Sequence, residues 1–279
     1  VPTATPTQPP ASATVTYRAL LVGNSNYAGS VSDLAAGPDL SAMSGLLSKL
    51  NMSGKTYKIT TRADLSASGI TSAISSAFSG ADDDDISLFY YSGHGVTDTG
   101  TYAGALVGVD ISYLTTAQLA SALSKVPGTV IVILDSCGSG AVIQSKNATG
   151  AATAQEAVSQ NPAAFNSAVL SAFSGFTAKS AEMATGSKFK VITACSIATS
   201  TWQNANGGFF TQGIARAGAL NGSFMNADND KNGTVTQSEA YSYARSYSKS
   251  VNDSSGVIPE WDMQVQSYPS GSAFPFFQR

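Results

Sequence analysis

The sequence predicts an α/β fold in which a mostly parallel sheet lies between two layers of helices. Short apolar runs alternate with segments whose apolar residues recur at helical spacing, an order that favours strand–helix–strand units. The run at residues 130–134 is apolar throughout, which is typical of a strand buried on both faces. With 279 residues, 43% of them hydrophobic, the chain is long enough for a full core.

The first half of the chain carries most of the strand and helix signals. Strands are expected at residues 17–23, 56–62, 86–91, 105–109 and 130–134. Helices with one apolar face are expected at residues 38–50, 64–78 and 115–126. Pro38 and Asp39 suit the start of the first helix, because proline needs no N–H partner there and a carboxylate favours a helix N-terminus. The candidate capping residues of the other two helices are Asp64 or Ser68 and Thr115 or Thr116.

The second half begins with a change of composition. Residues 144–186 are rich in Ala, Ser, Thr and Asn, with helical stretches such as residues 162–173. We expect an inserted segment that lies over or beside the functional site, and a plain surface excursion is the alternative. Beyond it, a strand is expected at residues 188–195 and helices at residues 207–219 and 238–248.

Charge and composition exclude several classes of protein. The net charge is −3, so the chain has no basic footprint for nucleic acid. No apolar run approaches the roughly 18 residues that a membrane span needs. Residues 1–16 are rich in Pro, Thr and Ala and are expected to be a flexible leader or linker before one domain at residues 17–279. Low charge with abundant Ser, Thr, Gly and Asn suggests an exported bacterial protein, secreted or at the cell surface.

A polar, glycine-containing turn follows each of two neighbouring strands, at residues 92–95 and 135–140. Ligands in open α/β sheets bind just beyond the carboxyl ends of the strands, so His94, the only histidine, and Cys137 should meet there. A thiol is a nucleophile only as thiolate, and imidazole is well suited to activate it near neutral pH. The pair is a candidate catalytic dyad; the alternatives are a small buried cysteine and a structural histidine. Cys195 is a weaker candidate, because no glycines surround it.

The segments YYSGHG and DSCGSG resemble the histidine and cysteine boxes of the caspase-like cysteine peptidases, the clan of caspases, metacaspases, clostripain and gingipains. The bacterial metacaspase-like branch is the most similar, from about Arg18 to the end of the chain. Gly208-Phe-Phe-Thr211 resembles the family's G-x-F-T pattern, and residues 263–271 resemble its closing strand. The resemblance implies a caspase-like three-layer α/β/α sandwich and a hydrolase of peptide bonds.

The resemblance also implies a mechanism through a thioester acyl-enzyme. His94 would act as general base and acid and Cys137 as nucleophile, with no third member of a triad evident. The backbone N–H groups of Cys137 and Gly95 would stabilise the oxyanion, and the glycines beside His94 would let the substrate carbonyl approach the backbone. In the clan the segment after the cysteine box commonly contains the maturation cleavage, which predicts a zymogen with Lys146 and Lys179 as candidate cleavage sites.

Two carboxylates indicate the specificity of such an enzyme. Asp135 lies two residues before Cys137, hence on the same face of the strand, and Asp39 begins the first helix near the end of strand 17–23. Two carboxylates that converge on one pocket would select Arg or Lys at the residue before the cut. The alternatives are a helix N-terminal charge for Asp39 and an ordinary turn residue for Asp135.

A calcium loop is a second, independent signal. Residues 228–239 match the pattern D-x-[DN]-x-[DN]-G-x₅-E of an EF-hand. The expected ligands of Ca²⁺ are Asp228, Asp230, Asn232, Thr234 through its carbonyl, and Glu239 with both oxygens. Thr236 and Glu239 also match a helix capping box, and this interpretation is compatible with calcium binding by the same loop. Metacaspases often have a separate activating calcium site, for which Asp98 and Asp110 are candidates, whereas the acidic run 82–85 is expected to be a solvated turn.

Two functional hypotheses follow. The first is a monomeric, secreted cysteine endopeptidase that cleaves protein or peptide substrates after Arg or Lys, is autoprocessed and depends on calcium. The alternative is a calcium-stabilised surface binding module that keeps the fold and does little catalysis. The intact pair of His94 and Cys137 favours the first hypothesis.

Overall fold

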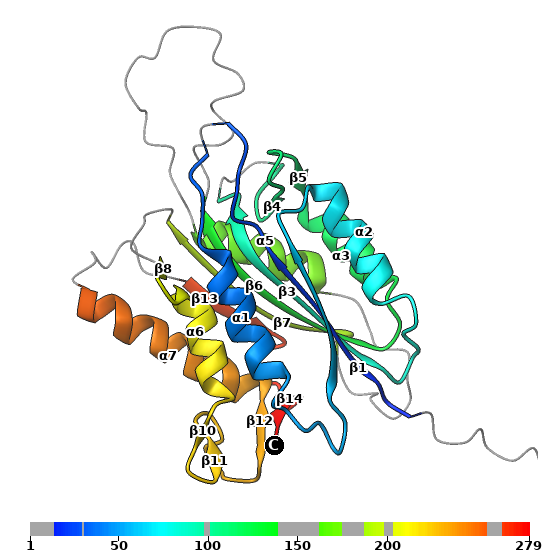
Figure 1. The fold of residues 1–279 in the computed structure, drawn as a ribbon, viewed down its shortest axis with the longest axis vertical. Coiled ribbons are helices and arrows are strands. Elements are labelled where there is room, and N and C mark those ends of the chain that lie inside the picture. The colour runs from blue at the N-terminus through cyan, green and yellow to red at the C-terminus, as the bar shows by residue number, and fades with distance from the viewer. Residues whose placement is uncertain are drawn as a thin grey trace, which may run out of the picture.

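The computed structural model of the protein is built around an eight-stranded sheet (Figure 1). It describes residues 14–29, 31–97, 101–138, 162–174, 187–197, 203–255 and 264–279. The main path of the sheet has the order β13-β7-β6-β3-β1-β2. These strands are β1 (Tyr17–Gly23), β2 (Tyr57–Ala63), β3 (Ile86–Gly95), β6 (Thr129–Gly138), β7 (Phe189–Ile197) and β13 (Gln264–Tyr268). All neighbours are parallel except β13, which runs antiparallel to β7, so the predicted mostly parallel sheet is confirmed.

Helices cover both faces of this sheet and complete the predicted three layers (Figure 1). One face packs against α1 (Ala36–Leu47), α6 (Phe209–Ala217) and α7 (Gln237–Ser255). The other packs against α2 (Ala67–Ala77), α3 (Thr116–Ser124) and α5 (Pro162–Phe173). Side chains alternate along each strand, so Leu88 and Tyr90 face the first layer while Phe89 and Tyr91 face the second. Because the strands are buried on both faces, their sequences are continuous apolar runs.

The remaining strands are short and lie outside the main path. They are β4 (Leu106–Val107), β5 (Tyr113–Leu114), β8 (Gln203–Asn204), β9 (Gly207–Gly208), β10 (Leu220–Asn221), β11 (Phe224–Met225), β12 (Thr234–Thr236) and β14 (Pro275–Gln278). β4 extends the sheet at the end of β3, and β12 pairs with β14 near the C-terminus. Within the described ranges, none of the helices is long and apolar enough to cross a membrane.

Part of the segment expected to be an insertion is a core helix. α5 has the predicted bounds, and its Phe165, Val169 and Phe173 are fully buried. The buried Asn166 amide donates to the Gln264 carbonyl at 2.8 Å and accepts from the Thr193 hydroxyl at 3.0 Å, which ties the helix to β13 and β7. The flanking parts, with the candidate cleavage residues Lys146 and Lys179, lie outside the described residues.

The caps of the helices only partly match the predictions. Thr115, one of the two candidates, caps α3, and the structure adds a complete capping box with Gln118. The cap of α2 is Ser66, which accepts from the Gly69 N–H at 3.0 Å, so both Asp64 and Ser68 were wrong. Asp64 instead accepts from backbone N–H groups of the β1–α1 connection, residues 24–35, because it points back towards β1.

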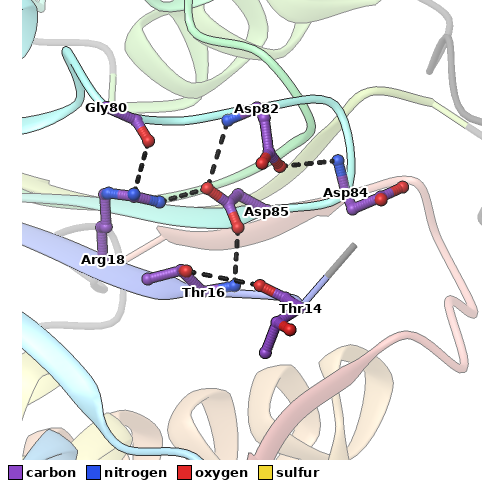
Figure 2. Close-up of polar contacts among 7 residues, drawn as sticks. All are labelled: Thr14, Thr16, Arg18, Gly80, Asp82, Asp84 and Asp85. Carbon is purple, nitrogen blue, oxygen red and sulfur yellow. Dashed lines mark hydrogen bonds and ion pairs between the residues drawn. The ribbon is translucent and has the colours of Figure 1, made fainter. Parts of the chain in front are cut away.

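The acidic run 82–85 contains a buried carboxylate in an ion pair and is not a wholly solvated turn. Figure 2 shows Asp85, which is 1% exposed, between the Arg18 guanidinium and the backbone N–H groups of Thr16 and Asp82. Arg18 also donates to the Gly80 carbonyl. Every donor around this carboxylate belongs to the start of β1 or to the turn before β3, so Asp85 joins these two strands and its role is structural.

We expect Asp85→Ala to lower the free energy of unfolding by about 3 kcal/mol, because the partly buried guanidinium of Arg18 would lose its counter-charge and the backbone N–H groups of Thr16 and Asp82 would lose their acceptor. Denaturant unfolding measures the change. Asp83→Ala removes an exposed carboxylate of the same run and should change stability by less than about 0.5 kcal/mol. Equal losses in the two variants would contradict a structural role specific to Asp85.

Candidate active site

The register of two central strands brings the predicted dyad together. β3 and β6 pair in parallel over ten residues each, and in this ladder His94 lies directly beside Cys137. Both positions are at the carboxyl ends of their strands, where ligands of open α/β sheets bind. Gly95, the expected oxyanion donor, is the next rung, in register with Gly138 and bridged on its other side to Leu106 of β4.

A backbone carbonyl fixes the tautomer of His94. The imidazole is 4% exposed, and its Nε2 lies 2.9 Å from the carbonyl oxygen of Ser32. A carbonyl can only accept a hydrogen bond, so Nε2 carries the proton. Nδ1 is then the basic nitrogen of the neutral ring, the one that can take a proton from a thiol. Ser32 could not be identified from the sequence, because a main-chain carbonyl has no side-chain signature.

Packing inside the protein explains the glycines of the SGHG segment. A Cβ atom on Gly93 would lie 2.4 Å from the Tyr91 hydroxyl and 2.7 Å from the Tyr27 hydroxyl. One on Gly95 would lie 2.4 Å from the Phe165 ring. Protein atoms occupy both spaces, so the structure corrects the expectation that these glycines clear a path for the substrate carbonyl.

Asp39 and Asp135 form a buried pair at the N-terminus of α6. They are 3% and 5% exposed. Asp39 accepts from the Ser92 hydroxyl at 2.6 Å and from the Gly208 N–H at 2.7 Å. Asp135 accepts from the N–H and hydroxyl of Thr211, at 3.0 and 2.5 Å. The two carboxylates converge as the sequence analysis expected, and the N–H groups of Gly208, the N-cap of α6, and of Thr211 in its first turn provide the backbone donors.

Burial makes both carboxyls weak acids. It raises the pKa of Asp39 to about 7, with a further contribution from the charge of Asp135 and opposition from the hydrogen bonds of Ser92 and Gly208. Burial also raises the pKa of Asp135 to about 6, against the hydrogen bonds from Thr211. Two like charges at close range resist joint ionisation, so the pair takes up a proton easily or favours a cation beside it.

These carboxylates occupy space that is free only because two neighbouring residues are glycines and have no Cβ atom. A Cβ atom on Gly207 would lie 2.0 Å from Asp39 Oδ1, and one on Gly208 would lie 2.6 Å from Asp135 Oδ2. Gly207 also has a φ of +98°, which other residues rarely adopt. Together with Ser92 and Thr211, these glycines surround the carboxylate pair, and sequence reasoning assigned none of the four. The G-x-F-T resemblance was the available signal.

The candidate calcium loop is folded as a compact turn. Ligand oxygens of Asp228, Asp230 and Glu239 lie within 4.8 Å of one another. The buried Asp228 carboxylate accepts from the N–H groups of Asn232 and Gly233, at 3.0 and 2.9 Å. The donor set, oxygen only and rich in carboxylates, fits Ca²⁺. Thr234, the expected carbonyl ligand, begins β12, which the C-terminal strand β14 holds in place.

Glu239 also completes the capping box that the sequence allowed. Its Oε2 accepts from the N–H and the hydroxyl of Thr236, each at 2.9 Å, while the Glu239 N–H donates to that hydroxyl at 3.2 Å.

For the separate activating calcium site, the candidate Asp98 lies outside the described residues, and the candidate Asp110 accepts hydrogen bonds from Ser112. In the part of the chain that is described, the loop 228–239 holds the one cluster of three metal-ligating side chains.

Cys195 lies in the wrong environment for a nucleophile. It is 0% exposed in the apolar layer beneath α5, in register with Ser136 of β6. A thiol buried among apolar side chains has its thiolate disfavoured and is inert. The alternative that placed the nucleophile at Cys195 is therefore wrong.

A three-layer sandwich with a histidine and a cysteine side by side at the carboxyl edge of its sheet defines a caspase-like class of protein. The family model of the caspase domain matches residues 16–250, and the chain belongs to that family. A solved structure of a Geobacter sulfurreducens protein, a structural-genomics target, is 20% identical, covers 95% of this chain and 97% of its own, and has a TM-score of 0.49. No curated protein matches the sequence.

Proposed function

We propose that the protein is a secreted cysteine endopeptidase that cleaves after Arg or Lys. The observation that carries the proposal is the rung shared by His94 and Cys137, with the imidazole held in the tautomer that leaves Nδ1 basic. Membership of a family of cysteine peptidases supports the reaction class.

The chemistry follows from this arrangement. His94 Nδ1 takes the proton of the Cys137 thiol, and the thiolate attacks the scissile carbonyl carbon. Backbone N–H groups of Cys137 and Gly95 stabilise the oxyanion. The imidazolium then protonates the leaving amine as the thioester forms, and the neutral ring next activates the water that hydrolyses it. Ser32 can keep its hydrogen bond throughout, because Nε2 bears a proton in both states of the ring.

The buried carboxylate pair supports a basic residue before the scissile bond. A guanidinium or ammonium inserted beside Asp39 and Asp135 would supply the positive charge that the pair lacks, and a guanidinium could bridge two carboxylates. Ser92, which already donates to Asp39, adds a third polar group. An acidic residue there would meet like charge.

Processing and calcium complete the proposal. A cut at Lys146 or Lys179 falls in the connection between β6 and β7, which pair directly, so both fragments would remain in one sheet. In the loop 228–239, Ca²⁺ would neutralise three converging carboxylates and anchor the start of α7. Because α7 packs closely on α6, this would support the helix that holds the carboxylate pair.

Fluorogenic peptides that end in Arg, Lys or Asp test the activity and the pocket together. We expect turnover of the Arg and Lys peptides that Cys137→Ala abolishes, and an increase in KM of about tenfold or more in Asp39→Asn with an Arg peptide. A preference for Asp would refute the pocket and spare the dyad. No turnover by a chain that has been cut between β6 and β7 would refute the peptidase and favour the binding module.

The raised pKa values predict a pH dependence for basic substrates. A carboxyl with a raised pKa stays neutral to a higher pH, so the pocket gains negative charge as the pH rises through the values of about 6 and about 7. The kcat/KM of an Arg peptide, divided by that of its neutral citrulline analogue, should therefore rise across this range. The ratio cancels the titration of the dyad, which affects both peptides alike. A ratio that does not change with pH would contradict the prediction.

Calcium should stabilise the folded protein. At a calcium concentration of about 100 times Kd, we expect the free energy of unfolding to increase by about 2.7 kcal/mol, and chelation to reverse the gain. Thermal unfolding measures it, and Asp230→Asn should abolish most of the shift by removing a ligand charge. Asp110→Asn, which changes an acid outside the loop, should keep the shift. Loss of the shift in Asp110→Asn alone would move the site away from residues 228–239.

A further inference from the structure

An aromatic side chain lies against the imidazole of the candidate dyad. The ring centroids of Tyr27 and His94 are 4.6 Å apart, and the two planes are tilted by 56°. Tyr27 is 7% exposed and lies in the connection between β1 and α1, which also provides the Ser32 carbonyl. One short segment therefore contacts both the face and the Nε2 edge of the ring.

The same tyrosine also forms a hydrogen bond with the backbone of the histidine. The Tyr27 hydroxyl accepts from the His94 N–H at 2.8 Å, and the Tyr91 hydroxyl, 3.5 Å away, donates to the His94 carbonyl at 2.9 Å. Gly93 makes room for both hydroxyls. His94 is thus held at its main chain by two phenols and at its ring by an aromatic face and a carbonyl.

Tyr27 is itself anchored. Its N–H donates to Asp33 at 2.9 Å, the next residue's N–H donates to the Val109 carbonyl at 2.7 Å, and its ring packs with Val96 and Val107. A ring held on both sides does not move freely, so it can define the orientation of a neighbour rather than follow it.

We propose that Tyr27 is a positioning residue for the dyad, which sets the orientation of the His94 ring and favours its protonated form. The proposal rests on the function proposed above, in which His94 transfers the protons. Catalytic groups must be held close to one geometry, and small displacements are costly. A tyrosine ring within about 6 Å of a cation also attracts it, which favours the imidazolium once the thiol has given up its proton.

The sequence offers an unusually direct test, because His94 is the only histidine and gives a single set of histidine NMR signals in the tag-free chain. We expect a ring-current shift of these signals that remains in Tyr27→Phe and disappears in Tyr27→Leu. Tyr57→Leu is the matched control, since Tyr57 is 6% exposed and packs on Tyr17 far from the dyad. A wild-type spectrum in Tyr27→Leu would overturn the proposal.

Kinetics separate positioning from simple loss of packing. We expect Tyr27→Leu to lower kcat by about tenfold with KM nearly unchanged, Tyr27→Phe to lose less, and Tyr57→Leu to keep the wild-type kcat. The pH profile for alkylation of Cys137, followed by mass spectrometry, should shift by about half a unit to higher pH in Tyr27→Leu. Equal losses of kcat in Tyr27→Leu and Tyr57→Leu would overturn the proposal.

The alkylation profile also separates this proposal from the function on which it rests. Should the wild-type chain cleave no peptide, the profile still reports whether Tyr27 acts on the pair of His94 and Cys137. A shift in Tyr27→Leu, together with no peptidase activity in a wild-type chain cut between β6 and β7, would support the positioning role and refute the proposed function. A profile that is the same in the wild type and in His94→Ala would overturn both, because no coupling would exist for Tyr27 to act through.

Discussion

The register between β3 and β6 is the constraint on which the site depends. The ladder runs without a bulge from the pair Ile86 and Thr129 to the pair Gly95 and Gly138, so the rung of His94 and Cys137 follows from every rung before it. Side chains alternate between faces along a strand, so a slip of one residue would send the buried side chains of β6 to the wrong helical layer. The two separate apolar layers therefore specify the register, and the register places His94 beside Cys137.

The buried carboxylate pair lowers the stability of the folded protein, whereas the packing of the sheet raises it. Two acids are buried within reach of each other's charge, and their raised pKa values express the unfavourable free energy of ionising them there. Hydrogen bonds from Ser92, Gly208 and Thr211 offset only part of that cost. A helix N-terminus needs at most one such acid as a cap. The second acid exceeds what a cap requires, and it is the observation that supports the proposal of a basic substrate residue.

The features that could be predicted from the sequence are those that depend on a repeated pattern or on residues close together along the chain. The main parallel strands, the bounds of α5 and a cap at Thr115 depend on local periodicity and short spacings, and they were predicted. Apart from β4, the short strands outside the main path were not, and β3 and β6 continue as strands into the segments that were predicted to be turns. The cap of α2 was missed, because several residues near it can accept from a helix N-terminus and only the backbone path selects Ser66. Ser32 was missed because 62 positions separate it from His94 and its contribution is a main-chain carbonyl. The glycines were noticed and misread, because the Phe165 ring that fills one of their spaces comes from a distant helix.

The connection from β1 to α1 unites the two halves of the site. It carries Tyr27 and Ser32 against the imidazole and leads within a few residues to Asp39 of the pocket. Its position is fixed from outside the site, by Asn24 between Leu65 and Val107 and by the Asp64 carboxylate. A displacement of this one segment would disturb the contacts of His94 and move Asp39 at the same time. In the proposed enzyme, substrate charge and proton transfer would therefore be linked through this loop, whereas the sheet beneath it holds the strand of Cys137 in place.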